Sequence, residues 1–161
     1  MSKITKILYA TDLSESARAA MTWAMSLAEK YEAAVTIIHV LPDLASMGYD
    51  LSVHFNAEQL AQINDEGQGK AVESIRERVK SVCEEIRDDL PSCRVDVNHI
   101  LIKTGHPVQE IIAAADDGKY DIVVMGTHGH SLIGDLLLGS VARGVVHKCK
   151  IPVLTIKLPA D

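Results

Sequence analysis

The stretch that decides the fold is DIVVMG at residues 121–126, in which the unbroken apolar run at 122–125 leads into a glycine. Short apolar runs without polar interruption are typical of strands buried on both faces of a parallel sheet. Open sheets of this kind bind their ligands beyond the carboxyl ends of the strands, and a glycine there lets the backbone approach an anion closely. We therefore expect a ligand site at Gly126.

Glycines continue beyond this strand at a fixed spacing. Two residues separate Gly126 from Gly129, and nine separate Gly129 from Gly139, which is followed by Ser140 and an apolar pattern of helical period. The first N–H groups of a helix have no partner within it and carry the positive end of the helix dipole, so they bind phosphate well. The spacing predicts a phosphate-binding loop that ends at the N–H groups of Ser140 and Val141.

Outward from this stretch, apolar strands alternate with amphipathic helices along the chain. We expect strands at residues 4–10, 34–41, 94–102, 121–125 and 152–157, and helices at residues 14–31, 56–89 and 108–116 and from residue 140. Right-handed crossovers join such elements into a parallel sheet. The sequence thus predicts an α/β fold with a doubly wound five-stranded parallel sheet, strand order 3-2-1-4-5 and helices on both faces, in a single domain over residues 1–161.

In this strand order the first and fourth strands are neighbours, which brings Asp12 close to Gly126. Asp12 follows Ala10 and Thr11 directly after the first strand, so its carboxylate can point into the crevice between the two strands. There it could accept a hydrogen bond from a ribose hydroxyl or hold a metal ion. It could also cap the turn into the helix that starts at Ser14, and the two roles can coexist.

The composition excludes some classes of partner. The formal net charge is -6 and the pI is near 5.6, whereas a nucleic-acid-binding protein carries a surplus of Lys and Arg on one face. No apolar run reaches transmembrane length or has the pattern of a signal peptide. The 3 cysteines are odd in number and lack metal-ligand spacing, which suits a reducing compartment. We expect a cytoplasmic protein that binds neither nucleic acid nor a membrane.

Common nucleotide-binding and catalytic signatures are missing from the sequence. There is no Gly-x-x-x-x-Gly-Lys-[Ser/Thr] loop, and no Gly-x-Gly-x-x-Gly follows the first strand. The crevice offers no Ser-His-Asp order, no paired carboxylates and no metal cluster, and thus no clear general base. Binding is therefore favoured over turnover.

These motifs together resemble the universal stress protein family, in the branch that binds ATP. The resemblance rests on YATD at residues 9–12, HV at 39–40, GTHG at 126–129, GSV at 139–141 and the closing strand IPVLTI at 151–156. It extends over nearly the whole chain. It implies a nucleotide-dependent sensor or regulatory module of the stress response, with an unknown protein partner.

The resemblance also implies which residues hold ATP and its Mg²⁺. Ala10, Thr11 and the backbone of Val40 would contact the adenine, and Asp12 would contact the ribose or a phosphate-bound Mg²⁺. The other expected contacts follow the sugar and the phosphates: Met125, Gly126, His128, Gly129, Gly139, Ser140 and Val141. Among these, His128 stands at a position that varies in the family.

An enzymatic alternative rests on THGH at residues 127–130. This segment resembles the [His/Thr]-x-Gly-His signature of nucleotidylyltransferases, which points to a slow ATPase or a nucleotidyltransferase. In that family, however, the signature follows the first strand, whereas here it follows the fourth.

The last predicted strand favours a homodimer. Residues 153–156 are apolar and β-branched and would lie at an open sheet edge, which pairs readily with a second copy around a two-fold axis. The family resemblance implies the same pairing. In the alternative, Lys157 and the tail at residues 158–159 cover the edge in a monomer.

Overall fold

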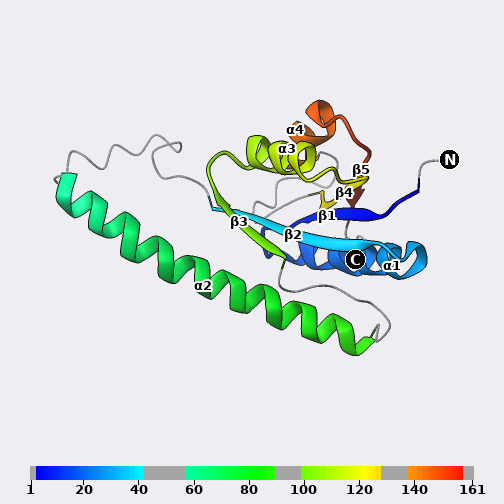
Figure 1. The fold of residues 1–161 in the computed structure, drawn as a ribbon, viewed down its shortest axis with the longest axis horizontal. Coiled ribbons are helices and arrows are strands. Elements are labelled where there is room, and N and C mark those ends of the chain that lie inside the picture. Colours follow the sequence, from blue (N-terminus) through cyan, green and yellow to red (C-terminus); the bar gives the residue numbers. More distant parts are fainter. Residues whose placement is uncertain (1–2, 42–56, 90–98, 128–137, 158–161) are drawn as a thin grey trace.

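The structure is a computed structural model that describes residues 3–41, 57–89, 99–127 and 138–157. Within these residues the strands are β1 (Lys6–Ala10), β2 (Ala34–Leu41), β3 (Ile100–Thr104), β4 (Ile122–Gly126) and β5 (Val153–Ile156) (Figure 1). Every neighbouring pair is parallel, and the order is β3-β2-β1-β4-β5. The predicted α/β fold and strand order are confirmed.

Helices cover both faces of the sheet (Figure 1). They are α1 (Glu15–Tyr31), α2 (Ala57–Asp89), α3 (Pro107–Asp117) and α4 (Ser140–Lys148). α1 and α2 pack on one face, and α3 and α4 pack on the other. This division follows from right-handed crossovers, because the chain moves one way along the sheet through β2 and β3 and the other way through β4 and β5. The direction reverses between β1 and β4.

The central strands are buried on both sides, as the apolar runs predicted. Ile7, Tyr9 and Val124 belong to the core under α1 and α2. Leu8, Ala10, Val123 and Met125 belong to the core under α3 and α4. The two cores hold β1 and β4 firmly side by side, so the carboxyl ends of these strands are rigidly placed.

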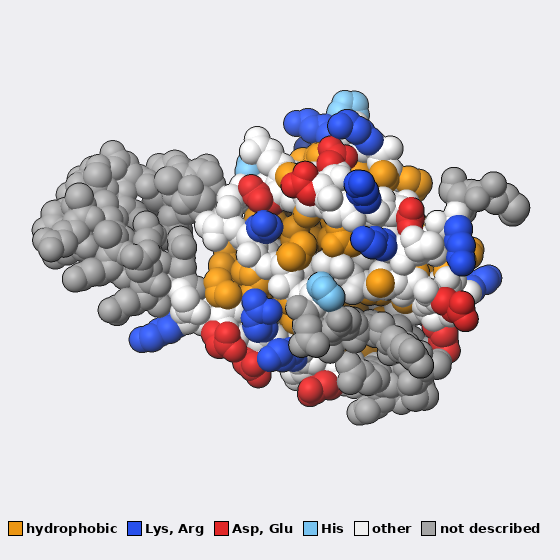
Figure 2. Space-filling model, viewed as in Figure 1, with side chains coloured by type: hydrophobic (Ala, Val, Ile, Leu, Met, Phe, Trp, Pro, Cys, Tyr) orange, Lys and Arg blue, Asp and Glu red, His pale blue; other side chains and the backbone are white. Residues whose placement is uncertain are grey.

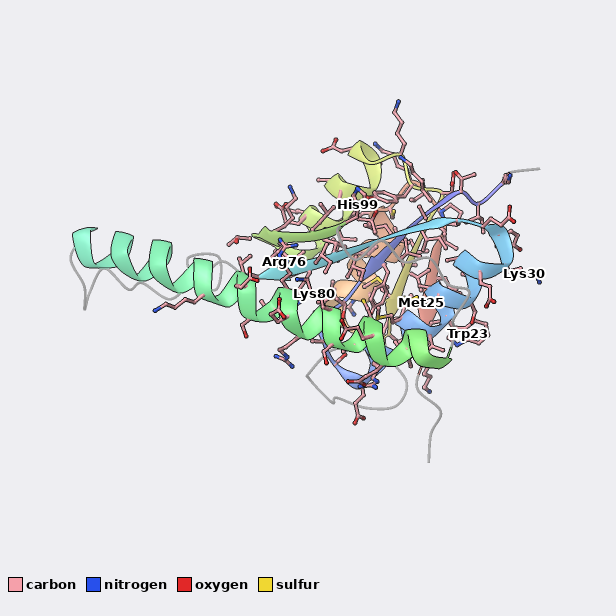
Figure 3. The ribbon with its side chains drawn as sticks, turned by 60° about the horizontal axis from the view of Figure 1, so that its bottom comes forward. Trp23, Met25, Lys30, Arg76, Lys80 and His99 are labelled. Carbon is pink, nitrogen blue, oxygen red and sulfur yellow. The ribbon has the colours of Figure 1, made fainter. Side chains whose placement is uncertain are left out.

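The bounds of β3 differ from the prediction. Residues 94–98 lie outside the described residues, and His99 is exposed and precedes the strand (Figure 3). β3 continues to Thr104, beyond the predicted end at residue 102, because its pairing with Leu41 of β2 persists where the side chains have become polar. β3 is an edge strand, as the predicted strand order 3-2-1-4-5 requires.

The described surface carries charges of both signs. On the face in Figure 2, basic and acidic side chains are interspersed around an apolar region near β2 and β3. No described helix combines the length and the apolar character that a membrane span requires.

Candidate functional site

The carboxyl ends of β1 and β4 lie side by side, with Ala10 level with Met125. Beyond β4, the N–H of Thr127 donates to the carbonyl of Ile156 at 2.9 Å, which anchors the end of β4 to β5. The N–H of Gly139 donates to the carbonyl of Thr127 at 2.8 Å. These bonds bring the start of α4 to the end of β4, where the sequence placed the phosphate-binding loop.

Among the described residues, no side chain caps the start of α4. Gly139 is the N-cap and supplies no side chain, and the first turn contains no acidic residue. The first intrahelical bond runs from the N–H of Arg143 to the carbonyl of Gly139 at 2.9 Å. The N–H groups of Ser140, Val141 and Ala142 therefore precede the helical hydrogen-bond ladder, at the positive end of the dipole. An anion is the partner that this end favours.

Asp12 organises the turn between β1 and α1. Its Oδ1 accepts hydrogen bonds from the N–H of Ser14 at 3.0 Å and from the Ser14 hydroxyl at 2.5 Å. The Ser14 hydroxyl in turn accepts from the N–H of Ala17 at 3.2 Å and caps α1. The structural role considered for Asp12 is therefore present, and it fixes the carboxylate at the end of β1.

Thr11 is buried and bonded through each of its polar groups. Its N–H donates to the carbonyl of Ile38 at 3.0 Å, and its Oγ1 accepts from the N–H of Leu13 at 3.1 Å. Its carbonyl lies 2.8 Å from Nδ1 of His39, a buried side chain of β2. The turn that carries Asp12 is thus tied to the neighbouring strand.

Tyr9 joins β1 to the first turns of α1, next to the same turn. Its hydroxyl donates to the carbonyl of Ala17 at 2.5 Å, inside the core between β1 and α1. Burial raises the pKa of the Tyr9 phenol well above its ordinary value, so this hydroxyl stays protonated and remains a donor.

Gly126 has a packing role that the sequence did not reveal. A side chain there would place its Cβ 2.5 Å from Oγ of Ser16 and 2.9 Å from the Ser16 carbonyl carbon. The first turn of α1 therefore approaches β4 so closely that only glycine fits. This contact brings the β1–α1 turn close to the end of β4.

The remaining predicted site residues fall into three groups. The side chains of Ala10 and Met125 are buried in the core under α3 and α4. Val40 is partly buried near the carboxyl end of β2 and packs against the same core. His128 and Gly129 lie outside the described residues.

Metal ligands are sparse in the part of the chain that the structure describes. It contains no group of three or more His, Cys, Asp and Glu side chains that could hold a metal ion. A hard cation such as Mg²⁺ commonly binds through one or two carboxylates together with the phosphates of its substrate. Asp12 is the predicted protein ligand of this kind.

Comparison with known proteins places the chain in a family. The model of the universal stress protein family matches residues 3–157. The chain belongs to the universal stress protein family. Universal stress protein MJ0577 of Methanocaldococcus jannaschii is 31% identical over 153 residues, which make up 94% of each chain.

Solved structures of universal stress proteins agree with the fold. A structure of MJ0577 matches with a TM-score of 0.77 and 26% identity over 99% of this chain and 100% of the other. A universal stress protein crystallised in complex with cAMP matches with a TM-score of 0.63 and 23% identity, over 97% of this chain and 98% of the other. The second likeness shows the shared fold.

Sequence reasoning missed the parts of the site that arise from contacts between elements. The sequence motifs include His39 and Tyr9 without giving either a role, and no motif includes Ser16. The strand period held a usable signal, because Tyr9 pairs with Ile37 and two residues further along both strands Thr11 comes level with His39.

Proposed function

We propose that this universal stress protein binds an adenine nucleotide at the carboxyl ends of β1 and β4, with ATP and Mg²⁺ as the expected ligand. The observation that carries the proposal is the bond between the Gly139 N–H and the Thr127 carbonyl, because it sets an uncapped helix N-terminus beside the switch point of the sheet. The nucleotide would act as the signal of a regulatory module rather than as a substrate.

The phosphates would lie at the start of α4. The N–H groups of Ser140 and Val141 offer donors to an anion, and the resemblance adds Gly139 and the glycines at 126 and 129. Mg²⁺, when bound with the nucleotide, would neutralise phosphate charge. Asp12 is the residue of this chain that would contact the ion or the ribose.

The base would lie at the ends of β1 and β2. Ala10 and Val40 belong to the adjacent parallel strands β1 and β2, and Thr11 directly follows β1. The related protein crystallised with cAMP supports an adenine ligand. Fixed backbone donors and acceptors match the hydrogen-bonding edge of adenine and do not match the different edge of guanine. ATP should therefore bind more tightly than GTP.

A slow ATPase or nucleotidyltransferase is the second candidate, based on residues 127–130. Donors that hold the ground state and the transition state equally lower Kd without speeding the reaction, and no base is evident in the described site. We expect turnover far below the roughly 10 per second that is typical of enzymes. Single-turnover assays with labelled ATP decide between the candidates, since chemistry faster than about 1 per second would favour the enzyme.

The proposal extends to assembly and location. β5 lies at the edge of the sheet, and we propose that it pairs with β5 of a second copy to form a homodimer in the cytoplasm. A protein partner would respond to the bound nucleotide.

Mass spectrometry of small molecules released from freshly purified, denatured protein tests the ligand directly. An adenine nucleotide in the released fraction is the expected result. Adding ATP and Mg²⁺ at a hundredfold excess over Kd should stabilise the fold by about 2.7 kcal/mol, or roughly 5 to 10 °C. No released nucleotide and no thermal shift with ATP, ADP or AMP at millimolar levels would refute the proposal.

A further inference from the structure

The turn between β1 and α1 is held in an unfavourable backbone conformation. Leu13 has a φ of 65°, in the left-handed region that a bulky side chain rarely adopts. Such a conformation persists only where surrounding contacts enforce it, and it is found often at ligand sites. The contacts that enforce it here converge on Thr11, two residues earlier.

His39 supplies the contact that comes from outside the turn. Its Nδ1 lies 2.8 Å from the Thr11 carbonyl, and both residues are buried. A carbonyl oxygen can only accept, so Nδ1 carries the proton and donates. The bond joins residues that are 28 positions apart and links β2 to the turn.

We propose that His39 is a positioning residue of the nucleotide site. Its Nδ1–H fixes the Thr11 carbonyl, and Thr11 in turn fixes Leu13 through the 3.1 Å bond from the Leu13 N–H to Thr11 Oγ1. Asp12 stands between these two residues, so these bonds hold the backbone that carries its carboxylate, and the bonds from Ser14 then orient the carboxylate itself. The inference rests on the proposed function, because it assigns His39 a role in that site.

The bond lowers the cost of binding by organising the turn beforehand. Without it, one of the bonds that hold the turn is lost, so the backbone of Leu13 and Asp12 is held less firmly although the bonds to Thr11 Oγ1 and Asp12 Oδ1 remain. A nucleotide would then have to restore the turn, and its affinity falls by the free energy of that step. The expected loss is about three- to tenfold in Kd, the range for one net hydrogen bond.

Substitutions at His39 distinguish the effect of losing this hydrogen bond from the effect of changing the packing of the side chain. In His39→Asn the amide nitrogen stands as far from the backbone as Nδ1 does, so we expect an ATP affinity within about twofold of the wild type. His39→Leu removes the donor, and His39→Gln moves it one atom further out, so both should show the three- to tenfold loss. If His39→Leu does not fold, the polar Asn and Gln variants still form a matched pair. His99→Leu, at the exposed histidine before β3, is the control and should bind as the wild type does (Figure 3).

Amide hydrogen exchange without nucleotide gives a second readout. The N–H groups of Leu13 and Ser14 report on the turn, since they donate to Thr11 Oγ1 and Asp12 Oδ1. They should exchange faster in His39→Gln than in His39→Asn. Equal ATP affinities and equal exchange rates in the Asn and Gln variants would overturn the inference. A wild type that binds no nucleotide would instead refute the proposed function, and exchange would still decide whether His39 holds the turn.

Discussion

Ser16 holds a buried hydroxyl that lacks a hydrogen-bond partner in the described part of the structure. The hydroxyl lies where a side chain on Gly126 would be, and leaving such a group unpaired costs about 1 to 3 kcal/mol. We expect Ser16→Ala to raise the free energy of unfolding by about 1 kcal/mol and Tm by roughly 2 to 4 °C. Calorimetry measures both quantities.

Ser26→Ala is the matched control, because Ser26 is exposed on the same helix and its replacement gains only helix propensity. The gain at Ser16 should exceed the gain at Ser26. A loss of stability in Ser16→Ala would mean that the hydroxyl has a partner in solution.

Asp121 joins β1 to β4 at the amino end of the sheet. Its Oδ2 accepts from the N–H of Thr5 at 2.7 Å, from the Thr5 hydroxyl at 2.9 Å and from the N–H of Lys6 at 2.9 Å. The backbone N–H groups of Thr5 and Lys6 stabilise the carboxylate and hold the pKa of Asp121 below its ordinary value.

The lowered pKa predicts how stability depends on pH. A carboxyl whose pKa is lower in the folded state stabilises the fold above its unfolded pKa, and this contribution disappears as the pH falls through the folded pKa. Asp121→Ala should therefore be less stable than the wild type at pH 7, and the difference should shrink below about pH 4. Urea unfolding at pH 7 and below about pH 4 measures this difference in stability. Asp117→Ala, at an exposed position in α3, is the control. A difference independent of pH would contradict the prediction.

Elements with a long pattern were predictable, and contacts between elements were not. β2 matches its predicted range, and α1 starts after its predicted cap, because local chemistry sets both. β3 continues beyond its predicted end at residue 102, because the pairing with β2, rather than its own side chains, determines where it ends. The bond from His39 to Thr11 and the fit of Ser16 against Gly126 depend on how the elements pack, which no local pattern contains.

Within the described residues the sheet ends at β3 on one side and at β5 on the other, and the proposed dimer uses β5. Pro152 and Ile156 accept bonds from β4 through their carbonyls, so by alternation the N–H and carbonyl of Thr155 face the open side. Leu154 and Ile156 pack against the core, so changes there would disturb the fold as well as the edge. Thr155→Pro removes only the outward N–H and should weaken the dimer, whereas Thr155→Val should not. Sedimentation equilibrium measures this, and a Thr155→Pro dimer of unchanged affinity would place the interface elsewhere.

The central claim is that the start of α4 holds the phosphates of an adenine nucleotide. Gly139 has φ -56° and ψ 157°, which other residues adopt freely, so Gly139→Asp and Gly139→Asn can both cap the helix. The two variants differ in charge, and the aspartate would repel a phosphate from the helix end.

Calorimetric titration of the wild type and both variants with ATP and Mg²⁺ tests this claim most directly. We predict one site per chain in the wild type, and an affinity at least about tenfold weaker in Gly139→Asp than in Gly139→Asn, with both variants as stable as the wild type or more so. Equal affinities in the two variants, or no binding of ATP by the wild type, would contradict the account.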